Sequence, residues 1–105
     1  MPTGAEIDKA GERIVAEWLS DKGYFTNFAT RPSDSTEIGA IGRDRKLLVL
    51  VKSSIVPYAP AKMTGEEEEN IRVKAAALGY QPWEATVLLD AQLELVIEIQ
   101  WRELA

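Results

Sequence analysis

Hydrophobic residues recur at two different spacings along the chain, and the change in spacing separates expected helices from expected strands. Near the start they fall on one face at helical spacing, whereas later segments are either continuously apolar or alternate with polar residues. Glycines and prolines between the segments mark turns. The pattern predicts a helix over 4–22, strands over 24–30, 36–42 and 46–53, a helix over 64–78, and strands over 83–89 and 93–101.

Both expected helices begin with the same sequence signal. Thr3 is followed three residues later by Glu6, and Thr64 by Glu67, a spacing at which hydroxyl and carboxylate reciprocally satisfy free backbone amides. A glycine follows the expected end of each helix, where it is typical of a C-terminal cap. Four consecutive acids at 66–69 begin the second helix, and we interpret them as carboxylates that oppose the helix dipole rather than as a metal site.

The strand over 46–53 is expected at the centre of a sheet, because its apolar run is continuous and needs cover on both faces. The strand over 93–101 alternates apolar and polar residues, so it should have one solvent-exposed face and lie near an edge. Short links favour an antiparallel arrangement of the first three strands, and the helix before the fourth allows a parallel crossover. The predicted fold class is α/β, a mixed five-stranded sheet flanked by helices, in a single domain over 1–105.

The amino-acid composition excludes several kinds of metal-binding and catalytic site. The 105 residues include no Cys and no His, which excludes thiolate ligands, the usual zinc ligands and every nucleophile that depends on histidine. The net charge is −5, but it is uneven: 1–63 hold 9 basic and 8 acidic residues, and 64–105 hold 3 and 9. Bulk charge therefore does not favour nucleic acid, although a local basic face is possible in the first part. No targeting or membrane segment is recognised, so we expect a cytoplasmic protein.

Lys52 is the unusual residue, because it ends the most apolar strand, where an ammonium group is costly unless it is paired or reaches water. A hairpin that turns between Asp44 and Arg45 would place Glu37 directly opposite it. Such a pair is either a structural salt bridge or part of a hydrolytic site, in which a carboxylate holds Mg²⁺ and a lysine orients or deprotonates water.

Four phrases of the sequence resemble one known family. They are GERIVAEWL at 11–19, KGY at 22–24, EIGAI at 37–41 and LVLVK at 48–52. Together with the order of the elements, they resemble the small restriction-endonuclease-like proteins of the PD-(D/E)xK superfamily, close to the bacterial proteins that are similar to Holliday junction resolvases. The resemblance spans about residues 4–90 and implies a restriction-endonuclease-like αβββαββ fold.

The resemblance also implies a site. In that family an Asp on the second strand and a Glu-x-Lys on the third, often with a Glu on the first helix, bind Mg²⁺ and activate water for phosphodiester cleavage. Carried over, the helix acid matches Glu12 and the lysine matches Lys52, while the Asp falls on Gly39 and the acid of Glu-x-Lys falls on Leu50. We therefore expect Lys52, Glu37 and Glu12 to form a residual polar cluster at a degraded nuclease site.

Three functions remain open from the sequence. The first is an endonuclease-like protein without metal-dependent nuclease activity and without a cofactor, which binds DNA or RNA weakly, or binds a protein partner. The second is a small interaction domain that forms a homodimer through the apolar fifth strand. The third is a divergent Mg²⁺-dependent nuclease that uses Glu37, Lys52 and Glu12. No membrane partner is expected.

Two further groups of residues have both a structural and a functional interpretation. Arg31, Arg43, Arg45 and Lys46 surround the second strand, and they either contact phosphate or are solvated residues of turns. The three tryptophans are interpreted as packing residues. We expect Trp18 in the core rather than on a surface that stacks bases, and the other two in packing or an interface.

Overall fold

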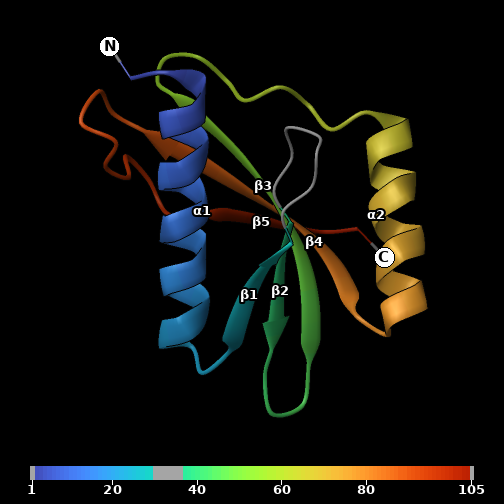
Figure 1. The fold of residues 1–105 in the computed structure, drawn as a ribbon. Helices are drawn as coiled ribbons and strands as arrows, with labels where there is room; N and C mark the ends of the chain where they lie inside the picture. The colour runs from blue at the N-terminus through green and yellow to red at the C-terminus, as the bar shows by residue number, and fades with distance from the viewer. Residues whose placement is uncertain (1, 30–36, 105) are drawn as a thin grey trace.

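A five-stranded sheet lies between two helices in the computed structural model, which describes residues 2–29 and 37–104 (Figure 1). The elements are α1 (Gly4–Asp21), β1 (Phe25–Ala29), β2 (Glu37–Ile41), β3 (Lys46–Ile55), α2 (Gly65–Leu78), β4 (Gln81–Leu89) and β5 (Gln100–Glu103). The strands lie side by side in chain order, and all neighbours are antiparallel except β3 and β4, which are parallel. This confirms the predicted α/β class and mixed sheet.

Both helices begin with the predicted capping box. The Thr3 hydroxyl accepts a hydrogen bond from the Glu6 amide at 3.1 Å, and the Glu6 carboxylate accepts one from the Thr3 amide at 2.9 Å. Thr64 and Glu67 make the same two bonds, each at 3.1 Å. At the other end of α2, Gly79 has a φ of 75°, a left-handed backbone that glycine adopts without steric cost.

Each face of the sheet carries its own hydrophobic core. Residues that alternate along β3 point to opposite faces, so Leu47 and Val49 pack beneath α1 whereas Leu48 and Leu50 pack beneath α2. In Figure 1 the two helices accordingly cover opposite faces. The continuous apolar run of β3 is thus buried on both sides, as predicted. Helix α1 approaches β3 so closely that a side chain at Gly11 would collide with Ser53.

The turn between β2 and β3 differs from the prediction, and the difference changes the register. The Gly42 amide donates a hydrogen bond to the Arg45 carbonyl at 2.7 Å, so the turn is centred one residue earlier than expected. Glu37 therefore lies opposite Leu50 and not opposite Lys52. The predicted pairing was wrong by two residues, because one step in the centre of a turn shifts the partners by two.

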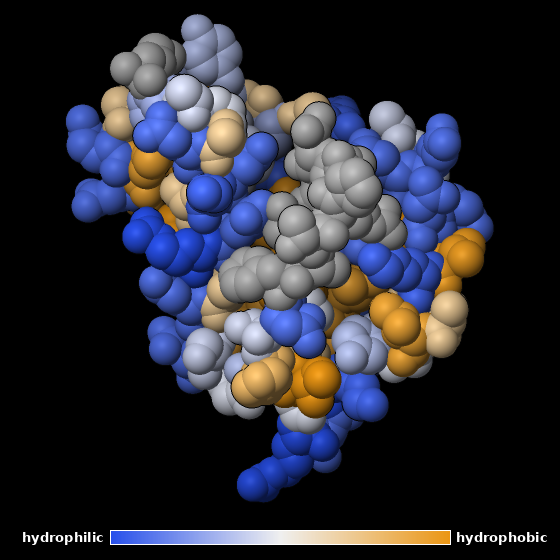
Figure 2. Space-filling view, in the orientation of Figure 1, coloured by the Kyte–Doolittle hydropathy of each residue, from blue (hydrophilic) through white to orange (hydrophobic). Residues whose placement is uncertain are grey.

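The tip of this hairpin is a hydrophilic end of the molecule. Residues 43–46 are all exposed, and the hairpin projects at the bottom of Figure 2 as a hydrophilic extension. Among the described residues, neither helix is long and apolar enough to cross a membrane.

The prediction of a last strand over 93–101 was wrong for the first part of that range. The Asp90 carboxylate accepts hydrogen bonds from the amides of Gln92 and Glu94 at 2.8 and 3.1 Å, and Leu93 has a φ of 64°. This local turn occupies 90–94 despite the alternating pattern. After it the chain makes one isolated bridge with β4, between Leu95 and Leu89, and then bends at 96–97. The ladder with β4 begins only at Gln100, and the intervening segment exposes three large apolar side chains, Leu95, Val96 and Ile97.

Candidate functional site

A row of four residues crosses the sheet on the face that α2 covers. Strand pairing places Glu37 on β2 beside Leu50 on β3, Leu50 beside Glu84 on β4, and Glu84 beside Arg102 on β5. Leu50 is buried, with 3% of its surface exposed, and packs against α2. A buried leucine therefore separates two carboxylates in the middle of the sheet.

The carboxylate on one side of this leucine is held by a lysine of α2. Glu37 is 3% exposed, and the Lys74 ammonium lies 2.7 Å from its Oε1. Lys74 precedes Ala75, which is fully buried against Leu50 and its neighbours, so the packing of α2 positions the ammonium group over β2. A buried carboxylate needs such a partner, because burial alone strongly disfavours its charge.

Lys52 lies on the same face, two residues further along β3, and is paired with a different residue. Its ammonium is 3.0 Å from Oε2 of Glu67, whose other oxygen caps α2 through the Thr64 amide. That backbone hydrogen bond first, and the hydrogen bond from Lys52 second, lower the pKa of Glu67 below its ordinary value. Lys52 is thus attached to the first turn of α2 by this ion pair.

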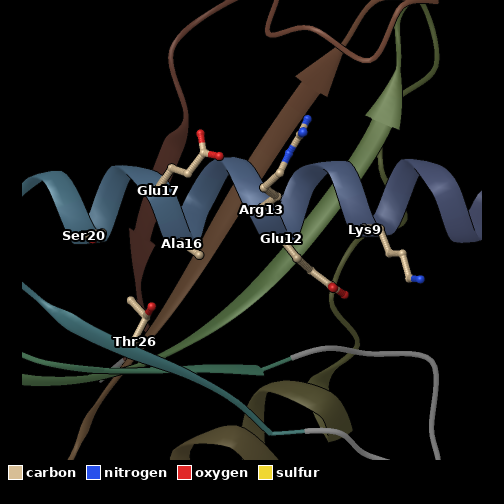
Figure 3. A pocket seen from close by; sticks show the side chains of 7 residues that line it. All are labelled: Lys9, Glu12, Arg13, Ala16, Glu17, Ser20 and Thr26. Atoms are coloured by element: carbon tan, nitrogen blue, oxygen red, sulfur yellow. The ribbon is translucent and has the colours of Figure 1, made fainter.

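Glu12, the third predicted residue, lies on α1 and therefore on the helix that covers the opposite face of the sheet. It lines a groove between α1 and β1, together with Lys9, Arg13 and Thr26. Figure 3 shows Glu12 and Lys9 pointing from the helix toward the side on which Thr26 lies. No ion pair among the described residues joins Glu12 to Lys52.

The strand register shows which β2 residue lies beside Leu50. Gly39 lies opposite Leu48, and a Cβ atom there would come within 2.6 Å of the Asn27 side-chain oxygen, so a larger residue at 39 would require this exposed side chain to move. Two acids that hold one metal ion must be neighbours, and the β2 neighbour of Leu50 is Glu37. Glu37, and not the residue at position 39, is therefore the β2 neighbour of Leu50.

The residues present do not fit the Mg²⁺ ion that the resemblance implies. Mg²⁺ requires near-octahedral coordination by oxygen, usually with one or two protein carboxylates. Leu50 supplies no oxygen, and the Glu37 carboxylate is already bound by the Lys74 ammonium. In the part of the chain that the structure describes, no group of three or more acidic residues is arranged to hold a metal ion.

Beside Lys52 lies a surface groove of about 450 Å³, here called the lysine groove. Lys52 and Lys62 contribute cations to it, and Thr86 contributes a hydroxyl. Its two carboxylates, Glu68 and Glu84, are paired within the groove, because Arg102 also lines it and lies 3.0 Å from each of them. The hydrogen bond to Glu84 is the main cause that raises the pKa of Arg102. The groove can therefore present the Lys62 ammonium to an anion, beside the ion pair of Lys52 with Glu67.

Sequence reasoning missed Lys74 and Glu84. Lys74 is seven residues after Glu67 on α2, a spacing of two helical turns, so helical periodicity alone places both over the same face of the sheet. Glu84 interrupts an otherwise apolar strand, which is the same signal that identified Lys52. The partners of both residues depend on the strand register, and the predicted register was two residues out.

The fold matches that of a solved structure. Hjc, a Holliday junction resolvase from the archaeal hyperthermophile Archaeoglobus fulgidus, superimposes with a TM-score of 0.68 over 87% of this chain and 74% of that one. The fold is restriction-endonuclease-like. The two sequences are 18% identical, so the likeness concerns the fold and assigns no role to any residue. No protein-family model and no curated protein matches the sequence.

Proposed function

We propose that this chain is an endonuclease-like protein that binds nucleic acid through the lysine groove and does not cleave it by a metal-dependent mechanism. The observation that carries the proposal is Leu50, which is buried between Glu37 and Glu84 where an acid would have to join them. Two ion pairs then hold α2 on the sheet. One joins Lys52 to Glu67, and the other joins Glu37 to Lys74.

Binding is supported by the fold and by the charge of the groove. The matched solved structure is that of a Holliday junction resolvase, so the fold favours nucleic acid as the class of ligand. Lys62 makes no ion pair with a described residue and lies beside Lys52. The net charge of −5 opposes binding at long range, so affinity should be weak and should fall steeply with salt. This role agrees with the cytoplasmic location predicted above.

The absence of cleavage follows from the chemistry of the groove. Hydrolysis of a phosphodiester at a metal site needs an ion that activates water and stabilises the developing charge. The described carboxylates near Lys52 are paired with cations, Glu67 with Lys52 itself and both Glu68 and Glu84 with Arg102, which leaves none of them free to hold such an ion.

The test uses a four-way DNA junction, a duplex and a single strand, each with Mg²⁺ or Mn²⁺ present. We expect binding that weakens with increasing salt, and no cleaved product. Lys62→Glu should weaken binding, whereas Lys9→Glu, an exposed lysine on α1, should leave binding unchanged. Metal-dependent cleavage that Lys52→Ala abolishes would restore the divergent nuclease, and binding that is insensitive to salt would exclude the groove.

A second function is favoured by one specific observation, the exposed apolar segment before β5. Leu95, Val96 and Ile97 are 41%, 48% and 44% exposed on consecutive residues, and β5 is the edge strand beside them. The occupant that we propose for this surface is a second copy of the chain. Sedimentation should show a dimer that Val96→Asp dissociates and that Val73→Asp, at an exposed valine of α2, leaves intact. A monomer at all concentrations would exclude this function.

A further inference from the structure

A pocket lined by aromatic rings opens beside the C-terminal end of α1, on the face of the sheet opposite the lysine groove. Its volume is about 380 Å³, within the range of small-molecule sites. It is formed where α1, the β2–β3 hairpin, β4 and β5 meet. The residues that matter for its chemistry are Trp18, Lys22, Tyr24, Arg45, Trp83 and Trp101. We call this the tryptophan pocket.

The three indole rings form one continuous aromatic surface. The ring centroids of Trp18 and Trp101 are 4.9 Å apart with the planes tilted by 43°, and those of Trp83 and Trp101 are 6.4 Å apart in an edge-to-face arrangement. Trp18 is 39% exposed, so its prediction as a core residue was wrong. An indole ring left open to solvent beside two others offers a flat apolar face to a planar ligand.

Two cations accompany these rings, and neither is neutralised. The Lys22 ammonium lies 5.3 Å from the centroid of Trp18, and the Arg45 guanidinium carbon lies 5.9 Å from that of Trp83. Arg45 donates two hydrogen bonds to the neutral side chain of Gln81, at 2.9 and 3.3 Å. Neither cation makes an ion pair with a described residue, and no acidic residue lines the pocket.

The pocket is therefore positive in a protein whose net charge is −5. This combination of aromatic faces and unpaired cations is complementary to a planar group that carries a negative charge.

We propose that the tryptophan pocket binds a nucleobase together with its attached phosphate. The base stacks on the aromatic surface of Trp18 and Trp101, and the phosphate is bound by Lys22 and Arg45. Every base can stack on an aromatic side chain, because every base has a π face. Bases in a duplex are stacked on each other and cannot enter, so the ligand is a free nucleotide or an unpaired base in a single strand.

The test follows the indole N–H signals of the ¹⁵N-labelled full chain by NMR. Adenosine monophosphate, a single-stranded oligonucleotide and the matching duplex are each titrated, with ribose 5-phosphate as a probe that lacks the base. We expect saturable shifts of the Trp18 and Trp101 signals. Saturation by the monophosphate identifies a free nucleotide as sufficient, and saturation by the single strand alone identifies an unpaired base within a strand. Equal shifts with ribose 5-phosphate or with duplex, or no shift with any probe, would overturn the proposal.

Charge variants test the phosphate contacts while all three indole rings remain. Lys22→Glu and Arg45→Glu should each weaken binding by about tenfold, whereas Arg43→Glu, at the exposed hairpin tip outside the pocket, should not. Trp18→Leu should cost about tenfold or more. Lys62→Glu changes the lysine groove alone, so it should leave nucleotide binding at the tryptophan pocket unaffected. The proposal for this pocket and the proposal for the lysine groove are therefore tested separately. Unchanged affinity in both pocket charge variants would contradict the assignment.

Discussion

The positively charged side chains on the two faces of the sheet have different kinds of partner. Beneath α2, Lys52, Lys74 and Arg102 each lie within 3.0 Å of a carboxylate oxygen. At the tryptophan pocket, Lys22 and Arg45 lie over aromatic rings and have no described acidic partner. Ion pairs hold a helix in place, whereas unpaired cations remain available to a ligand. The contrast is thus between the three cations that join α2 and β5 to neighbouring carboxylates and the two at the tryptophan pocket; Lys62 of the lysine groove resembles the latter, since it has no described acidic partner.

The largest expected effect comes from placing an acid at Leu50, in the row of residues that crosses the sheet from Glu37 to Arg102. Leu50→Glu places a third carboxylate between Glu37 and Glu84. Without metal, the buried charge should destabilise the fold by roughly 3 to 5 kcal/mol. Mn²⁺ or Mg²⁺ should recover part of this loss, because an ion that binds only the folded state stabilises it. Thermal unfolding with and without the ion measures both effects.

Leu48→Glu is the matched control for this variant. Leu48 has the same 3% exposure on the same face and strand, but its neighbours are Gly39 and Pro82. It should lose a similar amount of stability and gain none of it back from a divalent ion. Equal recovery in both variants would mean that the two flanking acids do not form half of a metal site.

The next effect in size concerns the two lysines on the α2 face. Lys74→Met leaves Glu37, which is 3% exposed, without that ammonium group and should cost about 2 kcal/mol. Lys52→Met should cost less than about 1 kcal/mol, because the side chain of its partner Glu67 is 35% exposed. Chemical denaturation of the two variants gives both values.

The double variant Lys74→Met/Glu37→Gln separates burial from simple loss of a contact. If Lys74→Met is destabilising because it leaves the charge of Glu37 buried, replacing that carboxylate with the neutral amide of Gln should restore much of the lost stability. A double variant less stable than Lys74→Met would show instead that Glu37 contributes through contacts that need its charge.

The fold was predictable because its signals are local. Capping boxes at Thr3 and Thr64 fixed where the helices begin, and the continuous apolar run of β3 identified the central strand. The exception is also local in origin. The alternating pattern before β5 satisfied the rule for a strand, but the Asp90 carboxylate and the left-handed backbone of Leu93 turn the chain there. Periodicity does not detect such competition between a side chain and the backbone ladder.

The site was less predictable because it depends on register and on distant partners. Placing the hairpin turn one residue late paired Glu37 with Lys52, whereas each of these residues is bound by α2, through Lys74 and Glu67. The tryptophan pocket was missed for a related reason. Its rings come from α1, β4 and β5, and no sequence spacing indicates that Trp18 and Trp101 lie 4.9 Å apart.

The smallest effect comes from acid, and it should leave the tryptophan pocket unchanged. The pKa of Glu67 is lowered from its ordinary value near 4.5, first by the backbone amide of Thr64 and then by Lys52. The stability that Glu67 contributes is therefore present above pH 4.5 and is lost as the pH falls through its lowered pKa. Lys52→Met removes the smaller cause, so the pKa of Glu67 should rise in that variant and still remain below 4.5. NMR titration of the Glu67 carboxyl carbon measures this shift. Because no acidic residue lines the tryptophan pocket, its indole signals should stay constant over the same range. Indole signals that move together with Glu67 would show that the two faces are coupled through the sheet.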